Sequence, residues 1–294
     1  MPPLYTIALH GGAGVNPERD YAQVEAHLGT LIGSCDAMLA DGASALDTVE
    51  FAVADMESSG LYVAGRGSAP NDQGVVECDA AIMDGARLKA GGVCAANDIA
   101  QPIRAARAVL DHTPYVLLAG DGARAFARER ELAMVTNPDA HFVVPVGVEP
   151  EEMLRLDEGL AHGTVGAVAL DTKGRLAAAT STGGLLGKRA GRVGDTPITG
   201  VGNWADSEVA VSCTGIGEAF VYAGGARDLA ARMAYGGESL EEAGASLLRA
   251  VMRNSGDGGL IAIDRHGDVT MPFNSAGMKR AVAGSRIARH VAIV

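Results

Sequence analysis

Hydroxyl and glycine residues gather in four short segments of the second half of the chain. A hydroxyl group can act as a nucleophile when a base lies beside it, and glycine lets a backbone N–H group come close to a ligand. Such segments can therefore hold a site for acyl transfer. They can equally be ordinary strand ends and turns, and the residue types alone leave both interpretations open. The segments are His162–Gly166 (HGTVG), Thr180–Gly184 (TSTGG), Gly191–Asp195 (GRVGD) and Ser212–Glu218 (SCTGIGE).

Several well-defined site motifs are missing from the sequence. It has no G-x-S-x-G turn for a hydrolase serine, and its 7 histidines show no H-E-x-x-H or other metal-ligand spacing. Gly187–Lys188 lacks the upstream glycine and the following Ser or Thr of a phosphate-binding loop. Thr214–Gly217 resembles half of a dinucleotide-binding loop, but Phe220 stands where its last glycine belongs. We therefore expect no metal site, no nucleotide site and no catalytic cofactor.

The charge of the chain argues against two classes of partner. Asp and Glu number 36 against 24 Lys and Arg, which gives a formal net charge of −12. An acidic chain repels nucleic-acid phosphates and anionic lipids, and no apolar stretch is long enough to span a membrane. The N-terminal residues lack a signal-peptide pattern. The four cysteines are widely spaced, which is typical of free thiols in a reducing compartment; they are Cys35, Cys78, Cys94 and Cys213. We therefore expect a cytoplasmic protein.

Hydrophobic spacing predicts strands and helices in the first half of the chain. Tyr5–Leu9 predicts a buried strand that runs into the glycines of His10–Gly14, and Glu77–Gly85 predicts a strand that ends in a turn. Prolines and acidic residues break the pattern from Thr136 to Gly163, which predicts a linker with a helical turn near Glu151–Leu156. The predicted helices cover about residues 18–39, 43–58, 103–110 and 123–133.

The second half predicts antiparallel hairpins. Thr164–Leu170 and Arg175–Thr180 form one aliphatic hairpin, and Leu260–Met271 repeats the design. Because strands come as hairpins and helices come in pairs, the pattern differs from a regular βαβ alternation. It predicts an α+β fold in which antiparallel sheets are covered by helices. Between the hairpins we expect the strand Glu208–Cys213 and the helices Glu218–Tyr235 and Leu240–Arg253.

Together and in this order, the four hydroxyl-rich segments resemble the plant-type asparaginase/isoaspartyl peptidase family of N-terminal nucleophile hydrolases. Each segment alone is a weak signal, but the set is highly specific, and the resemblance covers nearly the whole chain. Other segments that carry it are His10–Gly14, Cys78–Gly85, Gly91–Arg107 and Pro272–Met278.

This resemblance implies a four-layer αββα sandwich and self-cleavage between Gly163 and Thr164. Residues 1–163 would form an alpha subunit that ends in the linker of about 136–163. Residues 164–294 would form a beta subunit, with both subunits in one domain and two cleaved heterodimers in a dimer. Cleavage would give Thr164 a free α-amine, with a reference pKa of about 7.7–8.0, as the base for its own hydroxyl.

The resemblance also implies the groups that serve the nucleophile. Thr182 would hydrogen-bond to Thr164 Oγ1. The Thr214 hydroxyl and the Gly215 N–H group would form the oxyanion hole, where one donor typically contributes about 10²–10³ in rate.

Substrate binding is implied for a second set of residues. Arg192 would bind the substrate α-carboxylate in a bidentate pair, and Asp195 and the Gly217 carbonyl would bind its α-ammonium, with Thr214 and Gly215 at the carbonyl. Arg192 and Asp195, three residues apart, could instead form a surface ion pair with each other. If they hold an amino-acid head, the bond that is cut lies on the side-chain carboxyl.

One position departs from the family pattern. The family has N-A-G-x-G, in which the asparagine helps to hold the nucleophilic threonine, and here Val63 takes its place. Val63 cannot hydrogen-bond through its side chain, so either a neighbour substitutes or substrate preference differs. Asn71 and Asp72 are nearby polar candidates. Arg66, if it faces the site, would disfavour basic leaving groups.

The resemblance implies one structural sodium ion, bound by backbone carbonyls between Met56 and Arg66. The implied function is hydrolysis of β-aspartyl (isoaspartyl) dipeptides, with L-asparaginase activity on asparagine. Two alternatives stay open: a glycosylasparaginase-like amidohydrolase, and a processing-defective homologue with a binding role, for which Val63 is the motive.

Overall fold

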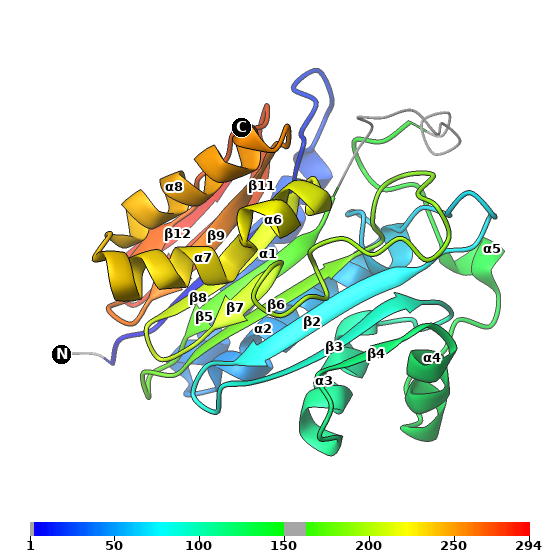
Figure 1. Cartoon of the computed structure of the whole chain (residues 1–294), viewed down its shortest axis with the longest axis horizontal. Helices are drawn as coiled ribbons and strands as arrows, with labels where there is room; N and C mark the ends of the chain where they lie inside the picture. Colours follow the sequence, from blue (N-terminus) through cyan, green and yellow to red (C-terminus); the bar gives the residue numbers. More distant parts are fainter. Residues whose placement is uncertain (1–2, 150–162) are drawn as a thin grey trace.

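The computed structural model describes residues 3–149 and 163–294. These residues form two β-sheets with helices packed against them, which confirms the predicted α+β class (Figure 1). The helical turn predicted at Glu151–Leu156 lies outside the described residues, as does His162. Within the two described ranges, no helix combines the length and apolar character that a membrane crossing requires.

The larger sheet has the strand order β12-β11-β1-β5-β6-β2-β3-β4. Its pairs are antiparallel except β3 with β4, which run parallel, so the expectation of purely antiparallel sheets is wrong at this edge. The strand bounds are β1 Thr6–Ala13, β2 Cys78–Asp84, β3 Lys89–Ala96, β4 Leu117–Ala119, β5 Val165–Leu170, β6 Leu176–Thr182, β11 Met278–Gly284 and β12 Ile287–Ala292.

The smaller sheet has the antiparallel order β10-β9-β8-β7. Its strands β8 and β9 lie against β1, β5 and β6 of the larger sheet. The bounds are β7 Asn203–Ala205, β8 Val209–Gly215, β9 Gly258–Asp264 and β10 Val269–Thr270.

Helices pack on both sheets. Helices α1, α2 and α3 contact the larger sheet, and α6, α7 and α8 lie over the smaller one (Figure 1). The bounds are α1 Ala22–Ala40, α2 Ala45–Ser59, α3 Pro102–His112, α4 Gly120–Glu129, α5 Pro138–His141, α6 Gly217–Ala223, α7 Gly225–Ala231 and α8 Leu240–Arg253, with a 3-10 turn η1 at Gly65–Gly67 and a π-helical turn η3 at Arg232–Gly236.

Apolar side chains form three buried clusters. One joins the larger sheet to α1–α4, one joins the smaller sheet to α6–α8, and the third fills the space between the two sheets. The third includes Val168 and Leu170 from β5 and Ile261 and Ile263 from β9, all buried. These aliphatic contacts fix the distance between β1 and the strands β5, β6 and β8, at whose ends three of the hydroxyl-rich segments lie.

Two sequence expectations about elements are corrected. The single helix predicted over Glu218–Tyr235 is divided into α6, α7 and η3, because Gly224 is left-handed (φ 81°) and Gly225 packs where a Cβ would lie 2.3 Å from the Val201 carbonyl oxygen. The helix expected at about 123–133 begins at Gly120 and ends at Glu129. Strands β3, β4, β7, β11 and β12 escaped prediction.

The end of α2 determines the course of the chain toward the hydroxyl-rich segments. Ser44 caps the start of the helix by accepting from the Asp47 N–H group, and Gly60 ends it in the left-handed conformation (φ 74°). The chain then turns back over the helix at Gly65 (φ 53°). A Cβ there would lie 2.5–2.7 Å from the Cβ, O and Cα atoms of Glu57. Gly65, the first glycine of the V-A-G-x-G segment, is thus required by packing.

We predict that Gly65→Ala destabilises the fold by more than about 1 kcal/mol, because the new methyl group meets backbone atoms at a positive φ. Gly29→Ala is the matched control. Gly29 lies inside α1 with nothing within 4 Å of its added Cβ, so alanine there should stabilise by roughly 0.5–1 kcal/mol. Urea unfolding of both variants measures the difference, and equal midpoints would contradict the packing described for Gly65.

Candidate active site

Thr164 directly precedes β5, and its peptide bond to Gly163 lies against β1. Thr164 is only 5% exposed. A Cβ on Gly12 would lie 3.2 Å from both Gly163 Cα and Thr164 N, and Gly12 has a φ of +100°. Both the close approach and the backbone conformation require glycine at position 12. The glycines after His10 therefore let β1 touch the bond that the sequence marks for cleavage.

Thr182 contacts the carbonyl side of the same bond. Its Oγ1 donates to the Gly163 carbonyl oxygen at 2.7 Å and accepts from the Gly184 N–H group at 2.9 Å. The register of β5 and β6, with Val165 opposite Ser181, brings Thr182 to this place. In the continuous chain, Thr182 thus donates to the carbonyl of Gly163, whereas the sequence suggested a bond to the Thr164 hydroxyl. A donor at this position polarises the carbonyl group.

Thr214 and Gly215 end strand β8 beside these groups. The Thr214 hydroxyl accepts from the Ala13 N–H group at 3.2 Å, and its own hydrogen stays available to an acceptor. Gly215 pairs with Gly258 across the sheet, and a Cβ on it would lie 2.3 Å from the Asp257 carbonyl oxygen. Only glycine fits there.

A small cavity brings together all the residues predicted for the site except Thr214, which does not line it. Its volume is about 10 Å³, close to the minimum of roughly 10–15 Å³ that one water molecule needs. The continuous chain therefore leaves no room for an amino-acid substrate. The lining residues are Gly163, Thr164, Thr182, Gly184, Leu185, Arg192, Gly194, Asp195, Thr196, Gly215 and Gly217.

Arg192 and Asp195 line this cavity with opposite charges, and no ion pair joins them to each other. Arg192 donates from Nε and Nη2 to the two carboxylate oxygens of Glu218, at 2.8 and 2.6 Å. Asp195 is 4% exposed, and its Oδ2 is buried without a hydrogen-bond partner. Burial raises the pKa of Asp195 to about 7, although a backbone hydrogen bond and Arg192 act in the other direction. Gly217 packs on this carboxylate, since a Cβ there would lie 2.9 Å from Oδ1.

A buried hydrogen-bond chain behind Thr164 was missed by sequence reasoning. His10 Nδ1 lies 3.0 Å from the Thr164 carbonyl oxygen and Nε2 lies 2.9 Å from Ser212 Oγ, which lies 2.8 Å from Thr180 Oγ1. A carbonyl can only accept, so Nδ1 carries the proton and Nε2 accepts from Ser212. Burial lowers the pKa of His10 to about 3, so the ring is neutral. The sequence did contain a signal for His10, because this residue begins His10–Gly14, one of the segments that carry the family resemblance.

Glu57 is a second buried group that the sequence did not mark. Its Oε1 accepts from Ser181 Oγ at 2.6 Å and from the Ile103 N–H group, in the first turn of α3, at 3.0 Å. Its Oε2 is buried without a partner. Burial raises the pKa of Glu57 to about 8, against the opposing effect of the Ser181 hydrogen bond. Glu57 therefore ties α2 and α3 to the residue that precedes Thr182.

Val63, which stands where the family pattern has an asparagine, and the polar residues that follow it lie in different places. Val63 is buried beside Gly163, where a Cβ on the glycine would lie 2.7 Å from Val63 Cβ. Arg66 does not line the small cavity, because its Nε donates to the His141 carbonyl oxygen. Asn71 accepts from the backbone of its own loop, and Asp72 accepts from the Ala190 N–H group. Neither polar candidate lines the cavity, so neither takes the place of the missing asparagine there.

A metal site built from side chains needs several acidic, histidine or cysteine side chains close together. In residues 3–149 and 163–294, no group of three or more of them is arranged to hold a metal ion.

Comparison with known proteins identifies close relatives along the full length. The family described as "Asparaginase" matches residues 3–293. The isoaspartyl peptidase of Salmonella typhimurium is 44% identical over 299 residues, which cover 94% of this chain and 94% of the relative. The isoaspartyl peptidase of Escherichia coli is 42% identical and covers 94% and 91% of the two chains. The isoaspartyl peptidase/L-asparaginase of Xenopus laevis is 39% identical, with coverage of 94% and 91%.

We predict that Glu57→Gln changes how stability depends on pH. The pKa of about 8 in the folded protein exceeds the reference value of about 4.3, so the folded state binds the proton more tightly. The stability contributed by protonated Glu57 is complete below pH ~4 and is lost as pH rises through about 8. In the variant the residue 57 side chain is neutral at every pH. As pH rises over this range, the free energy of unfolding of the variant should therefore increase relative to that of wild type by at most about 1.4 kcal/mol per pH unit.

Thermal or urea unfolding from pH 5 to 8 measures this difference. Glu241→Gln, at an exposed position of α8, controls for the loss of one carboxylate. If the wild-type and Glu57→Gln stabilities run parallel across the range, Glu57 is not the buried proton-binding group described above.

Proposed function

This chain belongs to the asparaginase family, and on that premise we propose that it is an isoaspartyl peptidase with L-asparaginase activity whose N-terminal nucleophile is Thr164. The observation that carries the proposal is the small cavity. In this cavity Thr164, the threonine of the Gly163–Thr164 bond, lies together with the hydroxyl donor Thr182. The same cavity is lined by Arg192 and by the buried Asp195. The names of the relatives supply the substrate class, which is isoaspartyl peptides and asparagine.

The first proposed step is self-cleavage of the chain. Thr164 Oγ1 attacks the Gly163 carbonyl carbon, the C–N bond breaks, and the Thr164 nitrogen leaves as an amine that takes up a proton. The ester formed between Gly163 and Oγ1 is then hydrolysed by water, which returns the hydroxyl and gives Gly163 a carboxylate. Thr182 supports this step because it already donates to the carbonyl oxygen on which negative charge develops. The neutral His10 ring fixes the carbonyl on the other side of Thr164.

The second step repeats the same chemistry on the substrate. The freed α-amine, with a reference pKa of about 7.7–8.0, accepts the proton from Oγ1 as the hydroxyl attacks the β-carbonyl carbon. The oxyanion lies toward the Thr214 hydroxyl and the Gly215 N–H group. The amine component then leaves with a proton, and water hydrolyses the aspartyl ester on Thr164. Every proton goes to or from the α-amine, so the reaction needs no cofactor.

The amino-acid head of the substrate completes the charges of the cavity. Arg192 binds the α-carboxylate, and Asp195 binds the α-ammonium together with the Gly217 carbonyl. A cation beside Asp195 favours its charged form and lowers the pKa that burial has raised. A substrate ammonium also supplies the partner that Asp195 Oδ2 lacks in the part of the chain that the structure describes. Glu218 orients the guanidinium group of Arg192 from the side.

The architecture supports the same assignment. We propose the four-layer αββα sandwich, because the three apolar clusters stack helices, sheet, sheet and helices. We also propose that residues 1–163 and 164–294 become alpha and beta subunits of one domain. Two such pairs would form a dimer, for which the exposed aromatic rings of Tyr222 and Tyr235 offer apolar surface. Four free, buried cysteines fit a reducing, cytoplasmic location.

A structural sodium ion is proposed at the turn after α2. The carbonyl oxygens of Tyr62 and Gly60 lie 2.0 and 3.1 Å from the point where a Cβ on Gly67 would sit. The Glu57 carbonyl oxygen lies 2.6 Å from the corresponding point on Gly65. Hard cations take oxygen ligands, so the backbone carbonyls of this turn are the candidate ligands of the ion.

The proposal is tested at Thr164. Thr164→Ala should leave the chain in one piece on a denaturing gel and abolish hydrolysis of β-aspartyl-leucine and asparagine. Thr164→Ser keeps a hydroxyl and should retain both cleavage and turnover. Wild-type protein should run as two fragments, of residues 1–163 and 164–294. An active wild-type protein that remains a single full-length chain would overturn the proposal.

A second prediction concerns the substrate head. Arg192→Lys should raise KM by about tenfold or more with a smaller change in kcat, because a lysine cannot make the bidentate pair with the α-carboxylate. Arg189→Lys, an exposed arginine of the same loop, is the control and should leave both constants unchanged. Steady-state kinetics on β-aspartyl-leucine measure the effect. A fall in kcat with unchanged KM would place Arg192 at the reacting bond instead.

A further inference from the structure

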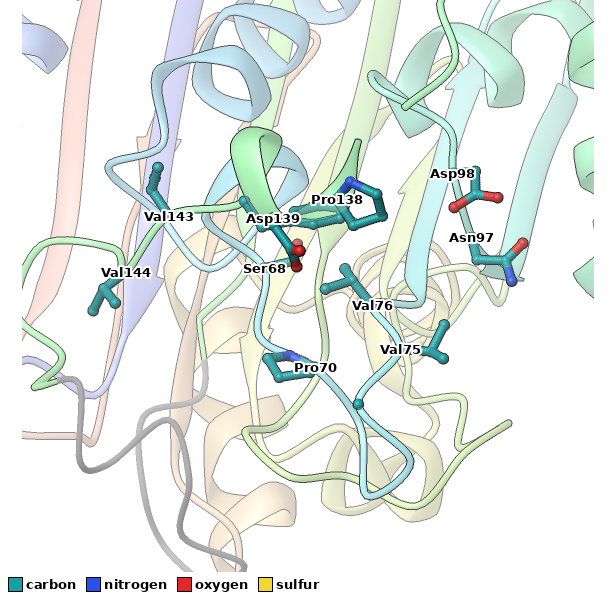
Figure 2. Close-up of a pocket in the computed structure, with 12 residues that line it drawn as sticks. Ser68, Pro70, Val75, Val76, Asn97, Asp98, Pro138, Asp139, Val143 and Val144 are labelled. Carbon is teal, nitrogen blue, oxygen red and sulfur yellow. The ribbon is translucent and has the colours of Figure 1, made fainter. Parts of the chain in front are cut away.

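A second, much larger cavity lies outside the small cavity at Thr164. Its volume is about 490 Å³, within the range of roughly 300–1,000 Å³ that is usual for small-molecule sites. Figure 2 shows it between the Ser68–Val76 loop, the turn at Asn97 and Asp98, and the segment from Pro138 to Val144. The lining residues are Ser68, Pro70, Gly74, Val75, Val76, Asn97, Asp98, Pro138, Asp139, Phe142, Val143 and Val144.

The two cavities are separate. No residue lines both, and none of the groups proposed for catalysis reaches the larger one. Its wall formed by residues 138–144 is held in place by Arg66, whose Nε donates to the His141 carbonyl oxygen and whose own carbonyl accepts from the Val143 N–H group, both at 3.0 Å. Val143 also packs on Gly60, where a Cβ would lie 2.7 Å from its Cγ2 atom. The cavity is therefore built by fixed contacts on this side.

The lining is apolar with acidic and neutral polar groups, and no lysine, arginine or histidine is part of it. Four valines, two prolines and a phenylalanine supply most of the wall. Asp98 forms an ion pair with Arg124, in which Oδ2 lies 2.8 Å from Nη2, and Arg124 is not part of the cavity lining. Asp139 comes from the first turn of α5, and Figure 2 places its carboxylate among the lining side chains, near Ser68. Asn97 Oδ1 is buried without a hydrogen-bond partner among the described residues, and Figure 2 draws the Asn97 amide on the opposite side of the cavity from Asp139.

We propose that this cavity binds a small apolar molecule that carries one protonated amine. The valine and proline walls take the apolar body, and the Asp139 carboxylate accepts from the ammonium group. A carboxylate ligand would meet the like charge of Asp139, and no cationic side chain lines the cavity to balance it, which costs free energy. The same charge excludes the free carboxylate of a dipeptide's second residue, so this site is not a place for the leaving group of the proposed reaction.

The site goes beyond the proposed hydrolase activity and does not depend on it. Binding touches the Ser68 loop, which packs on Gly183, where a Cβ would lie 2.4 Å from Ser68 Oγ. Gly183 follows Thr182 in the chain. A ligand here therefore lies one layer of side chains away from the proposed active site without entering it.

Calorimetric titration of the purified protein with three matched probes tests the site. They are 2-phenylethylammonium, 2-phenylethanol and 3-phenylpropionate, which share a ring and differ in charge. We expect the cation to bind at least about tenfold more tightly than the alcohol, and the anion to bind more weakly than either. Saturating L-aspartate in the buffer keeps the amine away from Asp195 and should leave its affinity unchanged.

Three variants locate the binding. Asp139→Asn should lower the affinity for 2-phenylethylammonium by about tenfold, and Val76→Phe should abolish its binding by filling the cavity. Asp121→Asn, in the first turn of α4 and outside the cavity lining, is the matched control and should change nothing. Thermal unfolding without ligand shows whether each variant is folded. Equal affinity for cation and anion, displacement by L-aspartate, or full affinity in folded Val76→Phe would overturn the proposal.

Discussion

The constraint on which the rest of the site depends is the close packing of strands β1 and β6 around the Gly163–Thr164 peptide bond. β1 touches it at Gly12, β6 reaches its carbonyl through Thr182, and His10 holds the next carbonyl along the chain. None of these contacts tolerates a larger residue at the glycines. Gly166, for example, has its Cβ position 2.0 Å from Ser212 Oγ and 2.3 Å from His10 Nε2. The aliphatic core between the two sheets sets these distances.

Electrostatics explain why the site is complete yet closed. Asp195 is buried with one oxygen unpartnered, and burial raises its pKa to about 7. Buried polar atoms without partners cost stability, and this oxygen belongs to a residue that lines the same cavity as Thr164, which is where we propose that the substrate ammonium binds. The cavity volume of about 10 Å³ leaves no space for an amino acid while the Gly163–Thr164 bond is intact. Release of the Gly163 end is the change that would make room.

Most of the residues that the sequence marked for a site lie together in the structure, Thr214 excepted, while their chemical roles stay predictions. Thr164, Thr182, Arg192, Asp195 and Gly215 were all named from motifs and all line one cavity. The motifs could not reveal that Arg192 pairs with Glu218, because that bond joins a loop to α6 across 26 residues.

Glu57 escaped for a different reason. In the sequence it is one acidic residue in an amphipathic helix, and only the packing of α3 and β6 makes it buried. Strands β3 and β12 were missed because glycines and polar residues hide their alternation. The single helix expected over Glu218–Tyr235 failed at Gly224, whose left-handed backbone has no signature in helical periodicity.

The central claim is that Thr164 carries the acyl group, and intact-mass spectrometry of protein quenched during turnover of a β-aspartyl dipeptide tests it most directly. We predict a transient gain of one aspartyl acyl group on the fragment that begins at Thr164, with peptide mapping to that residue. An acyl group on any other residue, or turnover by chains whose Gly163–Thr164 bond is intact, would contradict the claim.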